Sequence, residues 1–94
     1  MSDDYRDWVL NKALDEWGED AQLDMAIEEM SELITALQHR RRERISDDDV
    51  AEEIADVKIL IRQLELMFDE DKVDDEYWDK ITRLEHRLEA GEEL

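Results

Sequence analysis

Apolar residues recur every three or four positions along most of this 94-residue chain. That spacing is the period of an amphipathic α-helix, and no segment alternates convincingly with the two-residue period of a half-buried strand. The pattern predicts four helices, over about 3–17, 20–42, 47–68 and 74–90, with 69–73 as a polar loop. The predicted fold class is all-α, a compact four-helix bundle that forms a single domain over residues 1–94.

Residues with helix-ending or helix-starting preferences stand at the predicted boundaries. Gly18 and Gly91 follow the first and fourth helical patterns, where glycine ends helices most readily. Ser46 stands directly before three consecutive aspartates, which is typical of an N-cap followed by an acidic first turn. Asp74 is the predicted cap of the fourth helix.

The third helical pattern carries more apolar residues than one neighbouring helix can cover. Its main stripe alternates in steps of three and four, and four further apolar residues widen it: Val50, Ile54, Val57, Ile61, Leu64 and Phe68, then Ile59, Leu60, Leu66 and Met67. An apolar surface this wide favours burial against a second subunit. The sequence therefore predicts a homodimer or a homotetramer.

Composition narrows the classes of partner and compartment. Thirty acidic residues against twelve lysines and arginines give a net charge of −18, which argues against a nucleic-acid surface because such a surface needs a basic face. No apolar stretch is long enough to span a membrane, the acidic start is unlike a signal peptide, and there is no cysteine. We expect a cytoplasmic protein whose acidic coat suits either a salt-rich cytosol or simple solubility.

Two acidic pairs lie close to the apolar stripes of the second and third helical patterns. Glu29 and Glu32 are three residues apart, as are Glu53 and Asp56, so each pair shares a helix face. If the two helices pack side by side, the four carboxylates converge, and unpaired buried carboxylates are costly. A hard divalent cation would hold them together, and ligation by oxygen alone favours Mg²⁺, with Mn²⁺ as a substitute.

The simpler alternative is that these acids are ordinary carboxylates at the edge of the bundle. Either pair alone is more readily explained by ion pairs with Lys58, Arg62 or an arginine of another helix, because 45% of the chain is charged. Two pairs on consecutive antiparallel helices, each beside an apolar stripe, favour the metal site instead.

The acidic residues also carry a family resemblance. Glu28-Glu29-x-x-Glu32, followed after about twenty residues by Glu53-x-x-Asp56, resembles the all-α nucleoside triphosphate pyrophosphohydrolases, which include MazG, the dimeric dUTPases and the dCTP pyrophosphatases. The resemblance covers roughly residues 15–88 and is strongest to small MazG-like proteins. It implies Mg²⁺-dependent hydrolysis of a nucleoside triphosphate to the monophosphate and pyrophosphate. It assigns the metal to Glu29, Glu32, Glu53 and Asp56, and gives Glu28 and Glu29 catalytic roles.

The same resemblance suggests substrate contacts outside the acidic residues. Basic residues from about the region of Lys80 and Arg83 hold phosphates in the family, although surface pairing with Glu76 explains them equally well. Trp17 is a candidate for stacking on a base, yet a tryptophan in a small bundle is more often part of the core. Gln22, shortly before Glu28, is a further candidate for contact with the substrate.

Two other functions are alternatives to hydrolysis. A di-iron carboxylate bundle requires Glu-x-x-His on two helices, a pattern that this chain lacks. A non-catalytic acidic helical-bundle interaction module remains the alternative, and it predicts that Glu53→Gln and Asp56→Asn are tolerated. The sequence does not indicate which base or sugar the substrate would carry.

Overall fold

The computed structural model describes residues 2–91, so the ends of the expected domain, residue 1 and residues 92–94, lie outside the described part. Four helices make up this part: α1 (Asp3–Trp17), α2 (Glu19–Arg41), α3 (Asp47–Met67) and α4 (Glu70–Glu89). No strand occurs within residues 2–91. The all-α prediction with four helices is therefore confirmed, and the bounds of the first three helices agree with the prediction to within a residue.

Local side-chain chemistry explains where the helices begin. Ser46 and Asp49 form a reciprocal capping box, in which the Ser46 hydroxyl accepts from the Asp49 N–H and the Asp49 carboxylate accepts from the Ser46 N–H, as the sequence predicted. Gly18 joins α1 to α2 with a φ of 87°, a conformation that side chains with a Cβ rarely adopt.

The predicted loop over residues 69–73 is wrong. Helix α4 already begins at Glu70, because the carboxylate of Asp69 accepts a hydrogen bond from the Lys72 N–H at 3.1 Å and caps the helix. Asp74, the predicted cap, lies within the helix. Acidic residues in a first turn stabilise a helix N-terminus, and this acidic segment was mistaken for a loop.

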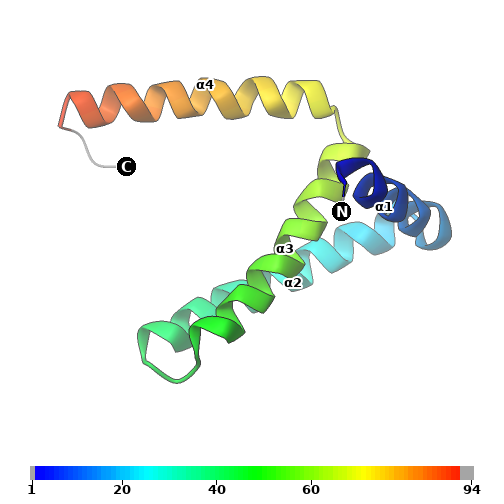
Figure 1. Ribbon diagram of the computed structural model, residues 1–94, viewed down its shortest axis with the longest axis horizontal. Helices are drawn as coiled ribbons and strands as arrows, with labels where there is room; N and C mark the ends of the chain where they lie inside the picture. The colour runs from blue at the N-terminus through cyan, green and yellow to red at the C-terminus, as the bar shows by residue number, and fades with distance from the viewer. Residues whose placement is uncertain (1, 92–94) are drawn as a thin grey trace.

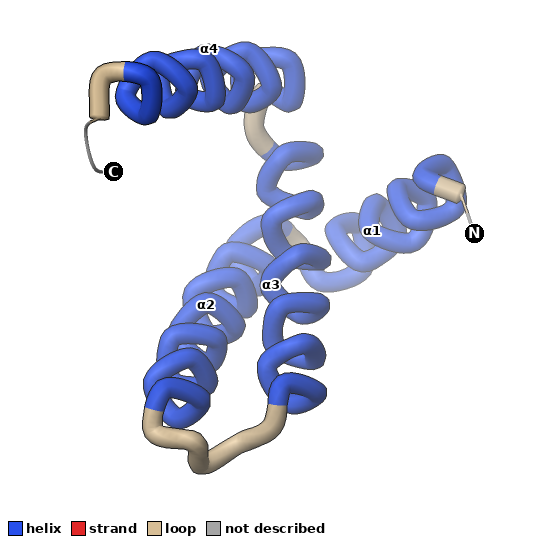
Figure 2. The backbone as a smooth tube through the Cα atoms, turned by 60° about the vertical axis from the view of Figure 1, so that its left-hand side comes forward, coloured by secondary structure: helices blue, strands red, loops and turns tan. Residues whose placement is uncertain are grey.

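The helices do not close into a compact bundle within one chain. Helices α2 and α3 form an antiparallel hairpin, α1 crosses its open end, and α4 leaves the C-terminal end of α3 at that same end (Figures 1 and 2). Among the described helices, α4 contacts only α3. The radius of gyration is 16.2 Å, whereas a compact chain of this length has about 12 Å.

Little of the apolar surface is buried in this arrangement. The buried apolar side chains are Leu10, Ala26, Ala36 and Leu60, whereas the expected stripe of α3 is largely exposed at Ile54, Ile61 and Phe68. Trp17, for which the core was the alternative to a substrate contact, is exposed, because α1 turns its Leu10 side toward the hairpin. The excess apolar surface predicted for α3 is present and extends to the other helices.

An ion-pair network joins three of the helices at one end of the hairpin. Arg62 of α3 donates two hydrogen bonds to Asp7 of α1, at 3.0 and 2.9 Å, and one of 2.8 Å to Glu70 at the start of α4. The Arg62 guanidinium, helped by Arg6, holds the pKa of Asp7 well below its usual range, and the pKa of Arg62 is raised in turn, chiefly by Asp7. This network orients α1 and α4 relative to α3.

None of the helices within residues 2–91 combines the length and the apolar character that crossing a membrane requires.

Candidate metal centre

Three of the four predicted carboxylate ligands meet between α2 and α3. Glu29 of α2 and Glu53 and Asp56 of α3 each place one carboxylate oxygen within 4.8 Å of the other two. Glu53 and Asp56 share a face because they lie three residues apart on α3. The antiparallel pairing of the hairpin brings Glu29 opposite them. We call these three residues the carboxylate cluster.

Two oxygens of the carboxylate cluster are buried without a hydrogen-bond partner. They are Oε2 of Glu29 and Oε2 of Glu53. Buried polar atoms are almost always paired in proteins, so an unpaired one calls for an explanation such as an ion. Two such oxygens in one cluster leave negative charge uncompensated by any described side chain.

The electrostatics of the cluster follow from this burial. The pKa of Glu29 is raised, first because burial disfavours the charged form and then because the carboxylates of Glu32 and Asp56 repel its charge. The pKa of Glu53 is raised for the same reasons: burial has the largest effect, and repulsion from the carboxylates of Glu32 and Asp56 adds to it. Raised carboxyl pKa values are the expected result when like charges share a partly desolvated site.

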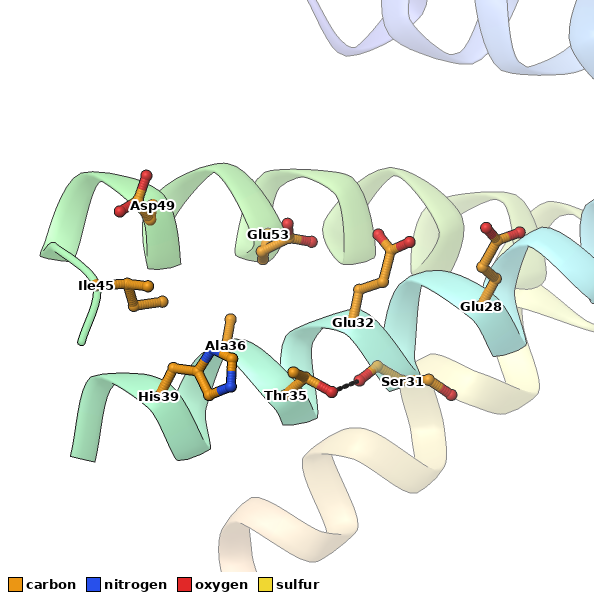
Figure 3. Close-up of a pocket in the computed structure, with 9 residues that line it drawn as sticks. All are labelled: Glu28, Ser31, Glu32, Thr35, Ala36, His39, Ile45, Asp49 and Glu53. Atoms are coloured by element: carbon orange, nitrogen blue, oxygen red, sulfur yellow. Dashed lines mark hydrogen bonds between the residues drawn. The ribbon is translucent and has the colours of Figure 1, made fainter. Parts of the chain in front are cut away.

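Glu32 and Glu28 border the cluster along a groove between the two helices. Figure 3 shows their carboxylates directed from α2 toward α3, with Glu32 beside Glu53. Glu32 is close enough to perturb both Glu29 and Glu53, and Glu28, directly before Glu29 in α2, is exposed. The groove has a volume of about 620 Å³ and is lined by Glu28, Ser31, Glu32, Thr35, Ala36, His39, Ile45, Asp49 and Glu53.

The donor set suits a hard divalent cation. All of the atoms that converge are carboxylate oxygens, which are the ligands that Mg²⁺ and Mn²⁺ prefer. The two unpartnered oxygens are available to such an ion, and Glu32 lies next to them. Glu29, Glu53 and Asp56 could hold the ion directly, with Glu32 as a fourth ligand or as an outer acceptor.

The two predicted phosphate-binding residues do not lie at this site. Lys80 and Arg83 are on α4, which projects away from the hairpin (Figure 1). They line a basic hollow of α4 with Leu84, His86 and Arg87. In one chain the structure therefore separates the basic candidates from the acidic ones, because α4 contacts neither α1 nor α2.

The other two predicted substrate contacts, Trp17 and Gln22, line a separate cavity toward the open end of the hairpin. It has a volume of about 710 Å³ between α1, α2 and α3, and its lining residues are Val9, Leu10, Ala13, Trp17, Ala21, Gln22, Met25, Ile59, Leu60 and Gln63. We call it the three-helix cavity. Gln22 is 6% exposed, and Trp17 stands at the rim with 65% of its surface exposed.

Sequence reasoning missed Gln63, the other polar residue of the three-helix cavity. Its side chain is only 2% exposed, and its Oε1 is buried without a hydrogen-bond partner. The available signal was a polar residue between Leu60 and Leu64 on the inward face of α3, seven residues after Asp56. A buried amide with an unpaired oxygen is as unusual as the unpaired carboxylate oxygens of the cluster.

Comparison of the chain with protein-family models, with curated proteins and with solved structures finds no match.

Proposed function

We propose that the protein is a Mg²⁺-dependent nucleoside triphosphate pyrophosphohydrolase of the MazG-like type. The observation that supports this most directly is the carboxylate cluster with its two buried, unpartnered oxygens, Oε2 of Glu29 and Oε2 of Glu53. A structural ion pair would place an arginine or lysine there. The cluster instead holds only carboxylates, next to an open groove that a substrate can enter.

In this proposal Glu29, Glu53 and Asp56 hold Mg²⁺, and Glu32 completes the ligand set. When bound, the cation neutralises charge on the triphosphate and makes its phosphorus more susceptible to attack. Glu28, exposed in the groove beside the cluster, orients the attacking water and accepts its proton. The oxygen of this water forms a bond to the phosphorus under attack, and the bond from that phosphorus to the oxygen that bridges the α- and β-phosphates breaks. The products are the nucleoside monophosphate and pyrophosphate.

The proposed enzyme is a homodimer or a homotetramer. Large apolar side chains remain exposed on every helix, including Trp78 at 59% on α4, and exposed apolar surface on this scale marks interfaces. A second copy would also explain how the basic candidates on α4 reach the carboxylate cluster, from which they are separated within one chain. Its α4 can bring Lys80 and Arg83 to the groove of its partner, where they would contact the phosphates.

The experiment that tests this function is an incubation with Mg²⁺ and a panel of NTPs and dNTPs, with chromatographic separation of the products. We expect monophosphate and pyrophosphate in equal amounts, and no product with EDTA or with Asp56→Asn. Asp48→Asn is the matched control, because Asp48 is exposed on the same helix and belongs neither to the carboxylate cluster nor to the lining of the groove. Its activity should stay within a few-fold of the wild-type value.

The exposed apolar surface also favours a second function, that of a non-catalytic interaction module. This alternative would take over if no nucleotide in the panel is hydrolysed in either low or molar salt. It further predicts that Glu53→Gln leaves Mg²⁺ binding unchanged.

A further inference from the structure

We infer that the three-helix cavity binds the base of the nucleotide and that Gln63 is the residue that reads the edge of this base. The inference rests on the proposed function, because it assigns the part of the substrate that the carboxylate cluster does not contact. It adds a specificity-determining residue that the sequence motifs do not include.

The first argument is the unpaired amide of Gln63. Its Oε1 is buried without a partner in a side chain that is 2% exposed, and the side chain lines an open cavity. A buried carbonyl oxygen without a donor is costly. A ligand that presents an N–H group in the cavity would supply the missing donor.

The second argument is the chemistry of the cavity wall. None of its lining residues is charged, and apart from the two glutamines they are apolar or aromatic. Such a wall excludes phosphate and favours a flat, neutral ring with a polar edge. A nucleobase has this character, because its faces stack on aromatic side chains and its edge carries N–H donors and acceptors. Trp17 at the rim offers an exposed ring for stacking.

The third argument is the position of the cavity relative to the carboxylate cluster. Gln22 lies seven residues before Glu29 on α2, and Gln63 lies seven residues after Asp56 on α3. Two helical turns span about 10 Å, and because the helices are antiparallel, both glutamines lie on the same side of the cluster. The sugar and α-phosphate of a nucleotide can bridge this separation, with the base between the glutamines.

Binding measurements that separate the base from the phosphates test the inference. Isothermal titration calorimetry with Mg²⁺ would compare the α,β-methylene analogues of dATP, dGTP, dCTP and dUTP with inorganic triphosphate, which has no base. We expect at least one analogue to bind about tenfold or more tightly than triphosphate. Gln63→Met keeps the length of the side chain. It should weaken the binding of that analogue by about tenfold or more and leave the affinity for triphosphate within about twofold of the wild-type value.

Gln38→Met is the matched control, because Gln38 is an exposed glutamine on α2 outside the cavity, and it should change neither affinity. A second measurement does not depend on the variant folding. In the ¹H–¹⁵N spectrum of the wild-type protein, the side-chain amide of Gln63 should shift on addition of the tight-binding analogue but not on addition of triphosphate.

The outcomes distinguish this inference from the proposed function. If triphosphate and all analogues bind equally, or if the Gln63 amide does not shift, the base does not bind in the cavity, although hydrolysis can still occur. If Gln63→Met instead weakens self-association, a second copy of the chain covers the cavity and the inference is wrong. If neither triphosphate nor any analogue binds with Mg²⁺, the proposed function fails and the inference fails with it.

Discussion

Glu29 of α2 and Glu53 of α3 lie 24 positions apart in the chain, yet their carboxylates share one site in which each leaves a buried oxygen unpaired. Burial and neighbouring negative charge raise the pKa of both groups. The hairpin therefore maintains an unfavourable arrangement of charge in the absence of a cation. A protein tolerates such an arrangement where the charge has a use, and carboxyl groups with raised pKa values are often found at functional sites.

Substitution of Glu53 is expected to lower activity while it raises the stability of the metal-free protein. Glu53→Gln should lower the rate of pyrophosphate release by about 100-fold or more, since even residues around the ligands of a metal site commonly contribute 10- to 100-fold. It should also raise the melting temperature of the chelator-treated protein by relieving repulsion in the cluster. Calorimetry with EDTA and with Mg²⁺ would measure this, and a wild-type melting temperature that does not respond to Mg²⁺ would contradict the metal assignment.

The pH dependence of the metal-free protein should have a definite sign. The pKa values of Glu29 and Glu53 are raised above the value near 4.3 of an unfolded glutamate. Their contribution to the free energy of unfolding is therefore most favourable at low pH, and it declines as pH rises through the folded-state pKa values. Urea titrations in EDTA from about pH 4 to about pH 8, which start near the unfolded value, would show this decline, and it should be smaller in Glu53→Gln. A wild-type decline no steeper than that of Glu53→Gln would contradict this prediction.

The Asp7–Arg62 pair should show the opposite pH dependence. Because Arg62 depresses the pKa of Asp7, this pair stabilises the fold above the unfolded aspartate value near 3.9 and loses its effect as pH falls below it. Asp7→Asn should lower the melting temperature most at pH 7, and progressively less as pH falls from about 4 toward the depressed folded-state pKa of Asp7. Asp3→Asn is the control, since Asp3 is highly exposed and makes only a peripheral pair with Arg6.

Core and interface residues should respond differently to protein concentration. Leu60 is buried within one chain, so Leu60→Ala should lower the free energy of unfolding by about 3 kcal/mol at any concentration. Trp78 is exposed on α4, so the effect of Trp78→Ala should be present where the wild-type protein is oligomeric and should disappear on dilution to concentrations where that oligomer dissociates. Analytical ultracentrifugation of both variants would check the assignment. A monomeric wild-type protein at high concentration would rule out the homo-oligomer.

Mixing two inactive variants would show whether a second copy supplies the basic residues. If α4 serves the groove of its partner, Asp56→Asn and the double variant Lys80→Ala/Arg83→Ala should each be inactive alone and regain part of the activity when refolded together. Mixing Asp56→Asn with Glu53→Gln should restore nothing, because both substitutions damage the same cluster. Full activity of the double variant alone would place Lys80 and Arg83 outside the site, and recovery in neither mixture would show that a second copy does not supply them.

Short-range features were readable from the sequence because local chemistry determines them. The helical period gave four helices, and Ser46 with its three aspartates located the start of α3, because capping depends on residues within one turn. The convergence of Glu29, Glu53 and Asp56 was also foreseen, since i, i+3 spacing and a short connection leave antiparallel pairing as the simplest arrangement. The start of α4 was missed because acidic residues suit both a loop and a helix N-terminus.

Only the tertiary structure decided how the helices lie relative to one another. The direction of α4 depends on the Arg62 network and on apolar contacts between distant segments, which periodicity does not encode. The same is true of Gln63, whose burial beside Gln22 follows from the packing of α1 on the hairpin. The sequence by itself determined which residues form helices and which carboxylates share a face. The packing determined which side chains stay unpaired, exposed or available to a ligand, because those properties depend on neighbours that are far away along the chain.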